Sequence, residues 1–235
     1  AREFLGSAVV ASVVVRNDLS VRKLEGLALE EPRWLTGAPS GLTPGTTPIW
    51  IRRADGRGGL PMRCDWFAGQ KTGFFLDQAD NVALLVRLLE EAGPMPSKVR
   101  VLDLCCYVGQ WSAQLAAAFA HHGIEAEFTL VDAQAQALEM AEHNVRTAGA
   151  AQVKAQRLDV LHGLDVLPSA GFDIVISDPP ALVKSRKDLG AGTHAYLQLH
   201  TQALRLAGPG AWIVACSCSA LLGEEDFAAT LAKAG

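Results

Sequence analysis

Residues 101–112 read VLDLCCYVGQWS, and this stretch decides the fold. A strand is predicted over 99–104, and a helix is predicted over 109–121. Between them, Gly109 lets the backbone pass close to a ligand. Asp103 stands at the strand end, where sheets of parallel strands bind their ligands, and offers a carboxylate to a cationic ligand. The stretch therefore predicts a strand, a ligand-binding loop and a helix.

The alternation of strand and helix continues to the end of the chain. Further strands are predicted over 126–131, 152–158, 172–177 and 211–217, and helices over 134–148, 195–206 and 223–234. Leucines at helical spacing between 84 and 89, followed by Gly93-Pro94, predict one more helix before the first strand. This order predicts an α/β fold over 71–235, with a doubly wound, mainly parallel, Rossmann-like sheet.

A small β-rich domain is predicted over 1–70. Residues 8–16 read as a strand because β-branched residues dominate them. Strands over 48–54 and 60–66 enclose the turn sequence DGRGG and predict a hairpin. The segment 31–48 is rich in proline and glycine and should hold little regular structure.

Composition excludes several classes of protein. Hydrophobic residues make up 49% and charged residues 20%, which is typical of a globular protein and not of a disordered one. No uncharged stretch supplies the roughly 20 apolar residues of a membrane span, and no secretory signal opens the chain. Five cysteines and six histidines show neither a disulfide framework nor metal-ligand spacing, so no metal is expected and a reducing cytoplasm is the expected location.

Charge is distributed unevenly along the chain. Residues 1–71 carry 10 basic and 7 acidic residues, a net +3, whereas residues 72–235 carry 11 and 18, a net −7. An overall charge of −4 argues against a protein that binds nucleic acid unaided. A basic cluster at Lys184, Arg186 and Lys187 is the exception in the acidic part, and it could position phosphates.

Acidic residues follow three consecutive predicted strands. Asp103 ends the first strand, and Asp132 ends the second, where a carboxylate can accept both hydroxyls of a ribose. Asp159-Val160 follows the third, where a carboxylate can accept from an exocyclic amine. The glycine pattern that a dinucleotide pyrophosphate requires is absent, which disfavours an NAD-dependent oxidoreductase.

Together with Asp178-Pro179-Pro180 after the fourth strand, this series resembles the class I S-adenosylmethionine-dependent methyltransferases. The resemblance implies that Asp103 faces the methionine part of S-adenosylmethionine, that Asp132 holds the ribose and that Asp159 meets the adenine. Two prolines make the loop after Asp178 rigid, as a catalytic carboxylate requires.

Three blocks sharpen the resemblance: GQKTGFFLDQ over 69–78, DPPALVKSRK over 178–187 and CSCS over 216–219. In this order they resemble the large-subunit ribosomal RNA (cytosine-5) methyltransferase family. The resemblance implies ribosomal RNA as partner, allows a homodimer, and assigns RNA binding to Lys184, Arg186 and Lys187. The cofactor-binding residues that it implies are Lys71, Thr72, Phe74, Asp103, Cys105, Tyr107, Gly109, Asp132, Ala133, Asp159, Val160 and Asp178.

The chain departs from the family pattern at three points. Ala79 and Val82 replace family arginines, which puts their contacts to cofactor or RNA in doubt. The family's N-terminal RNA-binding domain is expected to be absent, and residues 1–70 would be its β-rich middle domain. Two C-terminal edge strands of the sheet are also expected to be missing.

Catalysis is expected at Cys218 and Asp178. Carbon 5 of cytosine becomes nucleophilic when a thiolate adds to carbon 6, so this reaction needs a cysteine. Cys218 follows the fifth predicted strand, next to the strand that carries Asp178, which the resemblance places at the ring nitrogen 3 edge. Two alternatives remain, a methyltransferase of another RNA nucleobase position and an inactive S-adenosylmethionine-binding, ribosome-associated protein.

Overall fold

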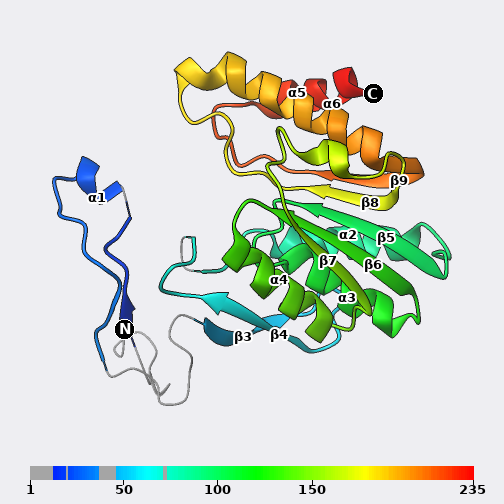
Figure 1. The fold of residues 1–235 in the computed structure, drawn as a ribbon, viewed down its shortest axis with the longest axis horizontal. Helices are drawn as coiled ribbons and strands as arrows, with labels where there is room; N and C mark the ends of the chain where they lie inside the picture. The colour runs from blue at the N-terminus through cyan, green and yellow to red at the C-terminus, as the bar shows by residue number, and fades with distance from the viewer. Residues whose placement is uncertain (1–12, 20, 37–45, 71–72) are drawn as a thin grey trace. The chain divides into compact units, whose positions relative to one another are not determined.

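The computed structural model describes residues 13–19, 21–36, 46–70 and 73–235 (Figure 1). The chain divides into two compact units. The first takes in the described residues up to Ile49 and Met62–Leu76, and the second takes in Trp50–Pro61 and Asp77–Gly235. The domain boundary at residue 70 stays a prediction.

Five parallel strands form the sheet of the second unit, in the order β7-β6-β5-β8-β9 (Figure 1). They are β5 (Lys98–Leu104), β6 (Glu125–Asp132), β7 (Gln152–Arg157), β8 (Phe172–Ser177) and β9 (Ala207–Ala215). The chain moves outward from β5 to one edge and then returns to β8 on its other side. This topology confirms the predicted doubly wound α/β fold, with its switch point between β5 and β8.

Strand β5 lies at the centre of the sheet and is covered on both faces. Val101, Leu102 and Leu104 are completely buried, as expected for a strand that has helices on both faces. Leu102 and Leu104 belong to a core cluster that includes Leu199 of helix α5 (Leu189–Leu206). The alternate residues of β5 point to the opposite face.

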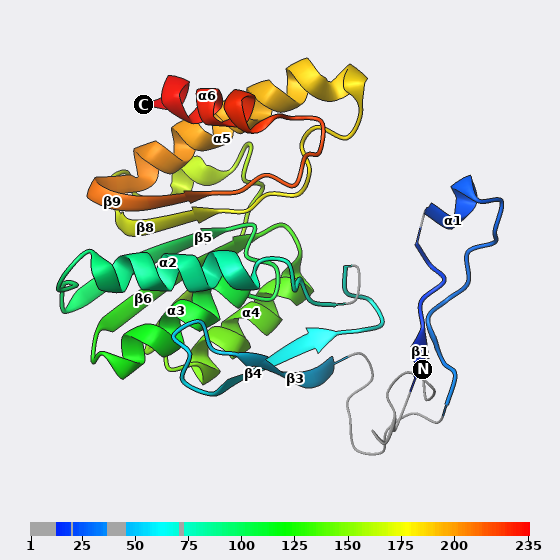
Figure 2. The ribbon, with the colours of Figure 1, turned by 180° about the vertical axis from the view of Figure 1, so that it is seen from behind.

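Helices cover both faces of the sheet. In addition to α5, they are α2 (Ala79–Glu91), α3 (Gln110–His121), α4 (Ala135–Thr147) and α6 (Glu224–Ala234), with short 3-10 turns at Leu164–Val166 and Arg186–Asp188. Figures 1 and 2 show α2, α3 and α4 on one face and α5 and α6 on the other. Each predicted helix is present.

Helix α5 begins six residues before its predicted start at 195. Gly190 and Gly192 lower the helix propensity of its first turn, which hides the start in the sequence. Space explains Gly192: a Cβ there would lie 2.5 Å from the Val183 side chain and 2.6 Å from the Leu182 carbonyl oxygen. Strand β9 covers 207–215 instead of the predicted 211–217, so Cys216 and Cys218 lie in the loop after it.

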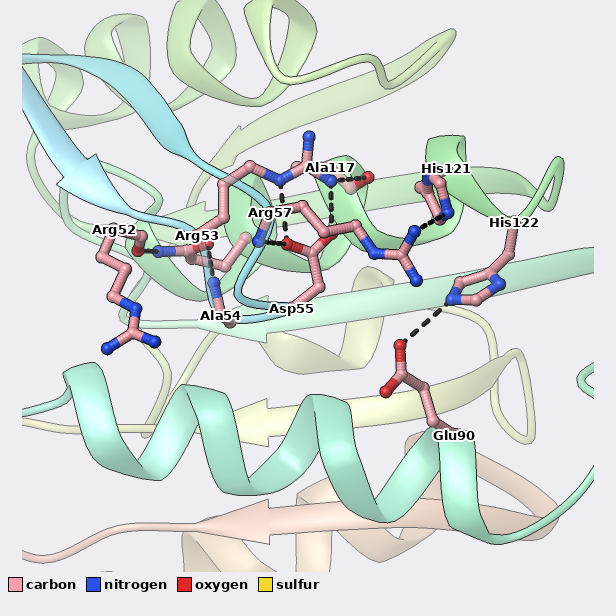
Figure 3. A network of polar contacts seen from close by, with 10 residues as sticks. Arg52, Arg53, Ala54, Asp55, Arg57, Glu90, Ala117, His121 and His122 are labelled. Atoms are coloured by element: carbon pink, nitrogen blue, oxygen red, sulfur yellow. Dashed lines mark hydrogen bonds and ion pairs between the residues drawn. The ribbon is translucent and has the colours of Figure 1, made fainter.

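Strands β3 (Thr46–Arg52) and β4 (Gly59–Asp65) form the predicted hairpin. Its tip belongs to the second unit and is fastened to α3, as Figure 3 shows. Arg53 donates to the carbonyl oxygen of Ala117 over 2.9 Å and pairs with Asp55. The Gln114 amide accepts from the backbone N–H of Ala54 over 2.8 Å and donates to the Arg52 carbonyl over 2.9 Å.

The first unit contains little regular structure. Strand β1 (Val14–Val15) pairs antiparallel with β2 (Arg33–Trp34), and α1 (Val21–Leu24) is one helical turn. Arg16 donates to the Trp66 carbonyl oxygen over 2.7 Å and holds β1 to the segment after β4. Of the strand predicted over 8–16, residues 8–12 lie outside the described residues.

Candidate functional site

The loop between β5 and α3 has an unusual backbone. Cys105, Tyr107 and Gly109 all have positive φ angles, of 61°, 49° and 77°. The left-handed conformation costs roughly 1–2 kcal/mol at a residue with a side chain, and such strain is concentrated at ligand sites. At Gly109 the space is also closed, since a Cβ would lie 3.0 Å from that of Ala141 on α4. The structure thus requires a glycine here for its backbone angle and for its packing on α4, and the close approach to a ligand stays a prediction.

Asp103 lies under this loop and is completely buried. Its Oδ2 accepts from the Ser112 hydroxyl of α3 over 2.6 Å, while Oδ1 has no hydrogen-bond partner among the described residues. Burial raises the pKa of Asp103 to about 7; the Ser112 hydrogen bond opposes this rise, and the carboxylates of Asp178 and Asp132 add to it. An unpaired buried carboxylate oxygen beside two other acids fits a cationic ligand.

Asp132 ends β6 with both carboxylate oxygens engaged by backbone. Tyr107 N–H donates to Oδ2 and Gln134 N–H donates to Oδ1, each over 2.9 Å. Asp132 therefore fixes the loop after β5 as well as its own. The neighbouring Ala133 is exposed, and its carbonyl oxygen accepts from Arg157 over 2.9 Å.

Asp159 and Val160 follow β7 and face different surroundings. Asp159 is exposed, and its pKa is lowered by hydrogen bonds from the Leu161 N–H and from His162. Val160 packs against the core cluster that includes Leu102 and Leu104. Asp159 thus presents its side chain at the surface, whereas Val160 is half-buried, and the role of both at an adenine stays a prediction.

Asp178 follows β8 and lies across the switch point from Asp103. Its Oδ2 accepts from the indole Nε1 of Trp111 on α3 over 3.1 Å, and its N–H donates to the Leu104 carbonyl oxygen over 3.3 Å. Pro179 is buried and Pro180 is exposed. The rigid loop predicted from two prolines is therefore held further by the side chain of Trp111.

Cys218 is the exposed cysteine among five, and its Sγ lies 3.9 Å from the Pro179 carbonyl oxygen. The fifth strand thus brings Cys218 to the loop that follows Asp178, as the predicted strand order requires. The other four thiols have a raised pKa, chiefly because they are buried. The pKa of Cys216 is raised to about 12, and the pKa values of Cys64, Cys105 and Cys106 are raised as well.

The predicted RNA-binding residues and three predicted cofactor-binding residues remain to be placed. Lys184, Arg186 and Lys187 are exposed and stand just after the loop of Asp178. Phe74 is buried within the first unit, so no relation to the strand ends is described for it. Lys71 and Thr72 lie outside the described residues.

Four side chains at this site were not predicted from the sequence. Trp111 and Ser112 lie in the quoted stretch, yet only the three-dimensional structure shows that they hold Asp178 and Asp103. Tyr196 and Ser219 hydrogen bond to each other across 23 residues, over 3.0 Å. No periodicity in the sequence connects them.

Within the described ranges no cluster of three or more histidine, cysteine or acidic residues could hold a metal ion. Nor does any helix of the described part have the length and apolar character needed to cross a membrane.

Comparison with known proteins gives the family. The methyltransferase small domain family matches residues 69–219. Two curated relatives are each named Ribosomal RNA large subunit methyltransferase I. The Aeromonas hydrophila protein is 32% identical over 227 residues, or 95% of this chain and 52% of its own length. The Erwinia tasmaniensis protein is 33% identical over 223 residues, or 93% and 51%. The chain thus spans about half the length of these relatives.

Solved structures confirm the fold. A SAM-dependent methyltransferase from Agrobacterium tumefaciens superposes with a TM-score of 0.60 at 20% identity, over 92% of this chain and 67% of that one. A P. horikoshii TYW2 in complex with MeSAdo gives a TM-score of 0.52 at 13% identity, over 77% and 54%. The cofactor of the family is S-adenosylmethionine, whose cationic charge suits the unpaired oxygen of Asp103. The chain therefore belongs to the methyltransferase small domain family, and over most of its length it is homologous to ribosomal RNA large subunit methyltransferases I.

Proposed function

We propose that the protein methylates carbon 5 of a cytosine in large-subunit ribosomal RNA through a covalent adduct with Cys218. One observation carries the proposal: the exposed thiol of the chain lies 3.9 Å from the Pro179 carbonyl oxygen, beside the acidic loop of the methyltransferase fold. The names of the curated relatives support ribosomal RNA as the substrate.

A thiol at this place can make carbon 5 of cytosine nucleophilic, which the reaction requires. Carbon 5 of cytosine is too weakly nucleophilic to attack a methyl donor directly. The thiolate of Cys218 adds to carbon 6, and the electron pair of the former 5,6 double bond becomes available at carbon 5. After carbon 5 has taken the methyl group, it loses its proton to a base. The 5,6 double bond then re-forms and the thiolate leaves, so the enzyme is regenerated.

Asp178 would hold the cytosine during these steps. Its carboxylate accepts from Trp111 through Oδ2, and the prolines that follow restrict its backbone. A carboxyl group fixed in this way can hydrogen bond the nitrogen 3 edge of the ring and favour the adduct. Trp111 therefore acts through Asp178, as the residue that orients it.

The acids at the strand ends would bind the cofactor, which supplies an electrophilic methyl group on a sulfonium. Asp103 offers its unpaired Oδ1 to the cationic part, and Asp132 offers the carboxylate that accepts ribose hydroxyls. Asp159 is exposed where an adenine amine could donate to it. At the end of the left-handed loop after β5, Gly109 would let the backbone pass close to the ligand.

RNA binding would include the exposed cluster of Lys184, Arg186 and Lys187. In the second unit, which is acidic overall, these cations directly follow the loop of Asp178. Contacts to phosphate position a substrate without reading its sequence, so this cluster fits placement of the RNA strand beside Cys218.

Substitution of Cys218 by serine tests the proposal. We expect Cys218→Ser to lose turnover on large-subunit ribosomal RNA, measured by mass mapping of 5-methylcytidine, while calorimetry gives nearly unchanged S-adenosylmethionine affinity. The matched control, Cys216→Ser, changes the half-buried thiol two residues away and should keep turnover. Near-normal methylation by Cys218→Ser would refute the adduct at this residue. Methylation at another nucleobase position would refute the cytosine assignment.

A further inference from the structure

Cys218 is flanked by two serines that hydrogen bond to one buried hydroxyl. Tyr196 of α5 is completely buried, and its hydroxyl oxygen accepts from the Ser217 hydroxyl over 2.9 Å. The same oxygen lies 3.0 Å from the Ser219 Oγ. Because the Ser217 hydroxyl donates to the Tyr196 oxygen, the Tyr196 hydroxyl can donate its own hydrogen to the Ser219 Oγ. Tyr196 thus holds the residue before Cys218 and the residue after it.

The network also reaches the loop after Asp178. Ser219 Oγ accepts from the backbone N–H of Val183 over 3.0 Å, and Ser219 N–H donates to Ser217 Oγ over 3.2 Å. Val183 lies three residues after Pro180 and is itself buried. A single polar network therefore connects the loop that carries Cys218 with the loop that begins at Asp178.

Packing fixes the ring that carries the hydroxyl. Tyr196 meets Phe227 of α6 edge to face, with ring centroids 5.4 Å apart and planes at 87°. Val183 and Leu222 complete a small buried cluster around it. A hydroxyl held in such apolar surroundings cannot turn to water, so its hydrogen bonds define one position of the loop.

The thiol itself has little that would hold it. Cys218 is exposed, and its Sγ approaches the Pro179 carbonyl oxygen over 3.9 Å. Its position therefore depends on the backbone of its two neighbours. A nucleophile must reach its target within a few tenths of an ångström, and a misplacement of about 1 Å can cost about 100-fold in rate.

We propose that Tyr196 is the positioning residue for Cys218, holding Ser217 and Ser219 so that the thiol keeps one place relative to Asp178. This inference rests on the proposed role of Cys218 as nucleophile. Because Tyr196 is completely buried, its effect on the reaction passes through the loop and not through a contact with the base or the cofactor.

Tyr196→Phe tests the hydroxyl and keeps the ring that packs on Phe227. We expect kcat on large-subunit ribosomal RNA to fall about 10- to 100-fold, with KM for the RNA and the calorimetric S-adenosylmethionine affinity within twofold of the unchanged protein. The pH profile of kcat should keep its shape, because the hydroxyl does not contact the thiol. Thr201→Ala, which removes an exposed hydroxyl of the same helix, should leave kcat unchanged.

A second readout follows the adduct directly. In an RNA whose target cytosine carries fluorine at carbon 5, no proton can leave that carbon, so the adduct persists and runs as a shifted band on a denaturing gel. Tyr196→Phe should form this band more slowly than the unchanged protein, to the same final extent.

The possible outcomes are distinct. A kcat equal to that of the unchanged protein would overturn the positioning role, as would a lower melting temperature with undiminished kcat. Should Tyr196→Phe fail to fold, Ser217→Ala and Ser219→Ala each remove one side of the same network, and full kcat in both would equally refute the inference. Retained turnover by Cys218→Ser would instead refute the proposed function itself.

Discussion

Replacing Asp103 by asparagine removes a charge that burial makes unfavourable and keeps the shape of the side chain. The carboxyl group is completely buried, and its pKa is raised to about 7 from an ordinary value of 3.8. An asparagine amide resembles the protonated acid, and its oxygen can still accept from Ser112. The substitution therefore compares the neutral form of this residue with a form that ionises.

The size and sign of the effect follow from proton linkage. Between about pH 4 and pH 7 the folded protein keeps the Asp103 proton that the unfolded chain has lost, so the stability of the unchanged protein falls as the pH rises. At 1.36 kcal/mol per pKa unit, the unchanged protein loses at most about 4 kcal/mol of folding stability relative to Asp103→Asn. Above about pH 7 the difference stays constant, and near pH 4 the two proteins should be equally stable.

Urea unfolding at pH 4.5, 6 and 8, followed by tryptophan fluorescence, measures the difference. Asp173→Asn is the matched control, because Asp173 lies on β8 with a partly exposed side chain paired to Arg100 over 3.5 Å. We expect the control to change stability by less than about 1 kcal/mol at every pH. The same Asp103→Asn protein should bind S-adenosylmethionine more weakly at pH 8.

A difference between Asp103→Asn and the unchanged protein that does not vary with pH would refute the reasoning. So would a variant that is less stable at pH 8, since the buried charge would then have a partner that compensates its desolvation. Either result would remove the physical argument that Asp103 is kept for a cationic ligand.

Three further predictions concern the same site. Gly109→Ala should destabilise the protein by at least about 1–2 kcal/mol in urea unfolding, because φ is 77° there; unchanged stability would mean that the loop can relax. Asp132→Ala should weaken S-adenosylmethionine by roughly 1.5–3 kcal/mol in calorimetry, and equal affinity would contradict its placement at the ribose. Replacing Lys184, Arg186 and Lys187 together by alanine should lower the salt slope of log RNA affinity by about one to three units, and an unchanged slope would remove the cluster from the RNA surface.

The sequence predicted the sheet well because its central strands carry buried apolar residues. In β5, Val101, Leu102 and Leu104 are completely buried, and the acid near the strand end stands out beside them. The start of helix α5 was predicted six residues too late, because Gly190 and Gly192 suggest a loop. Gly192 is explained by its distance to Val183, a contact that no local pattern encodes.

The candidate site, too, could be predicted only in part. Asp103, Asp132 and Asp178 could be predicted because each follows its own strand, and parallel strands bring such ends together. What holds these acids could not be predicted. Trp111 reaches Asp178 over 67 residues of sequence and Tyr196 reaches Ser217 over 21, and both contacts depend on how α3 and α5 pack on the sheet.

The fastening of the hairpin tip to α3 limits how this gene can be cut and recombined. Residues 50–61 belong to the second unit, although residues 62–76 return to the first before the second resumes at 77. A fusion that started at residue 77 would leave the Gln114 amide and the Ala117 carbonyl without the backbone and Arg53 contacts they now make. A transfer of the second unit as a module must therefore include residues 50–61. Over evolution, this arrangement would favour inheritance of the two units as one piece.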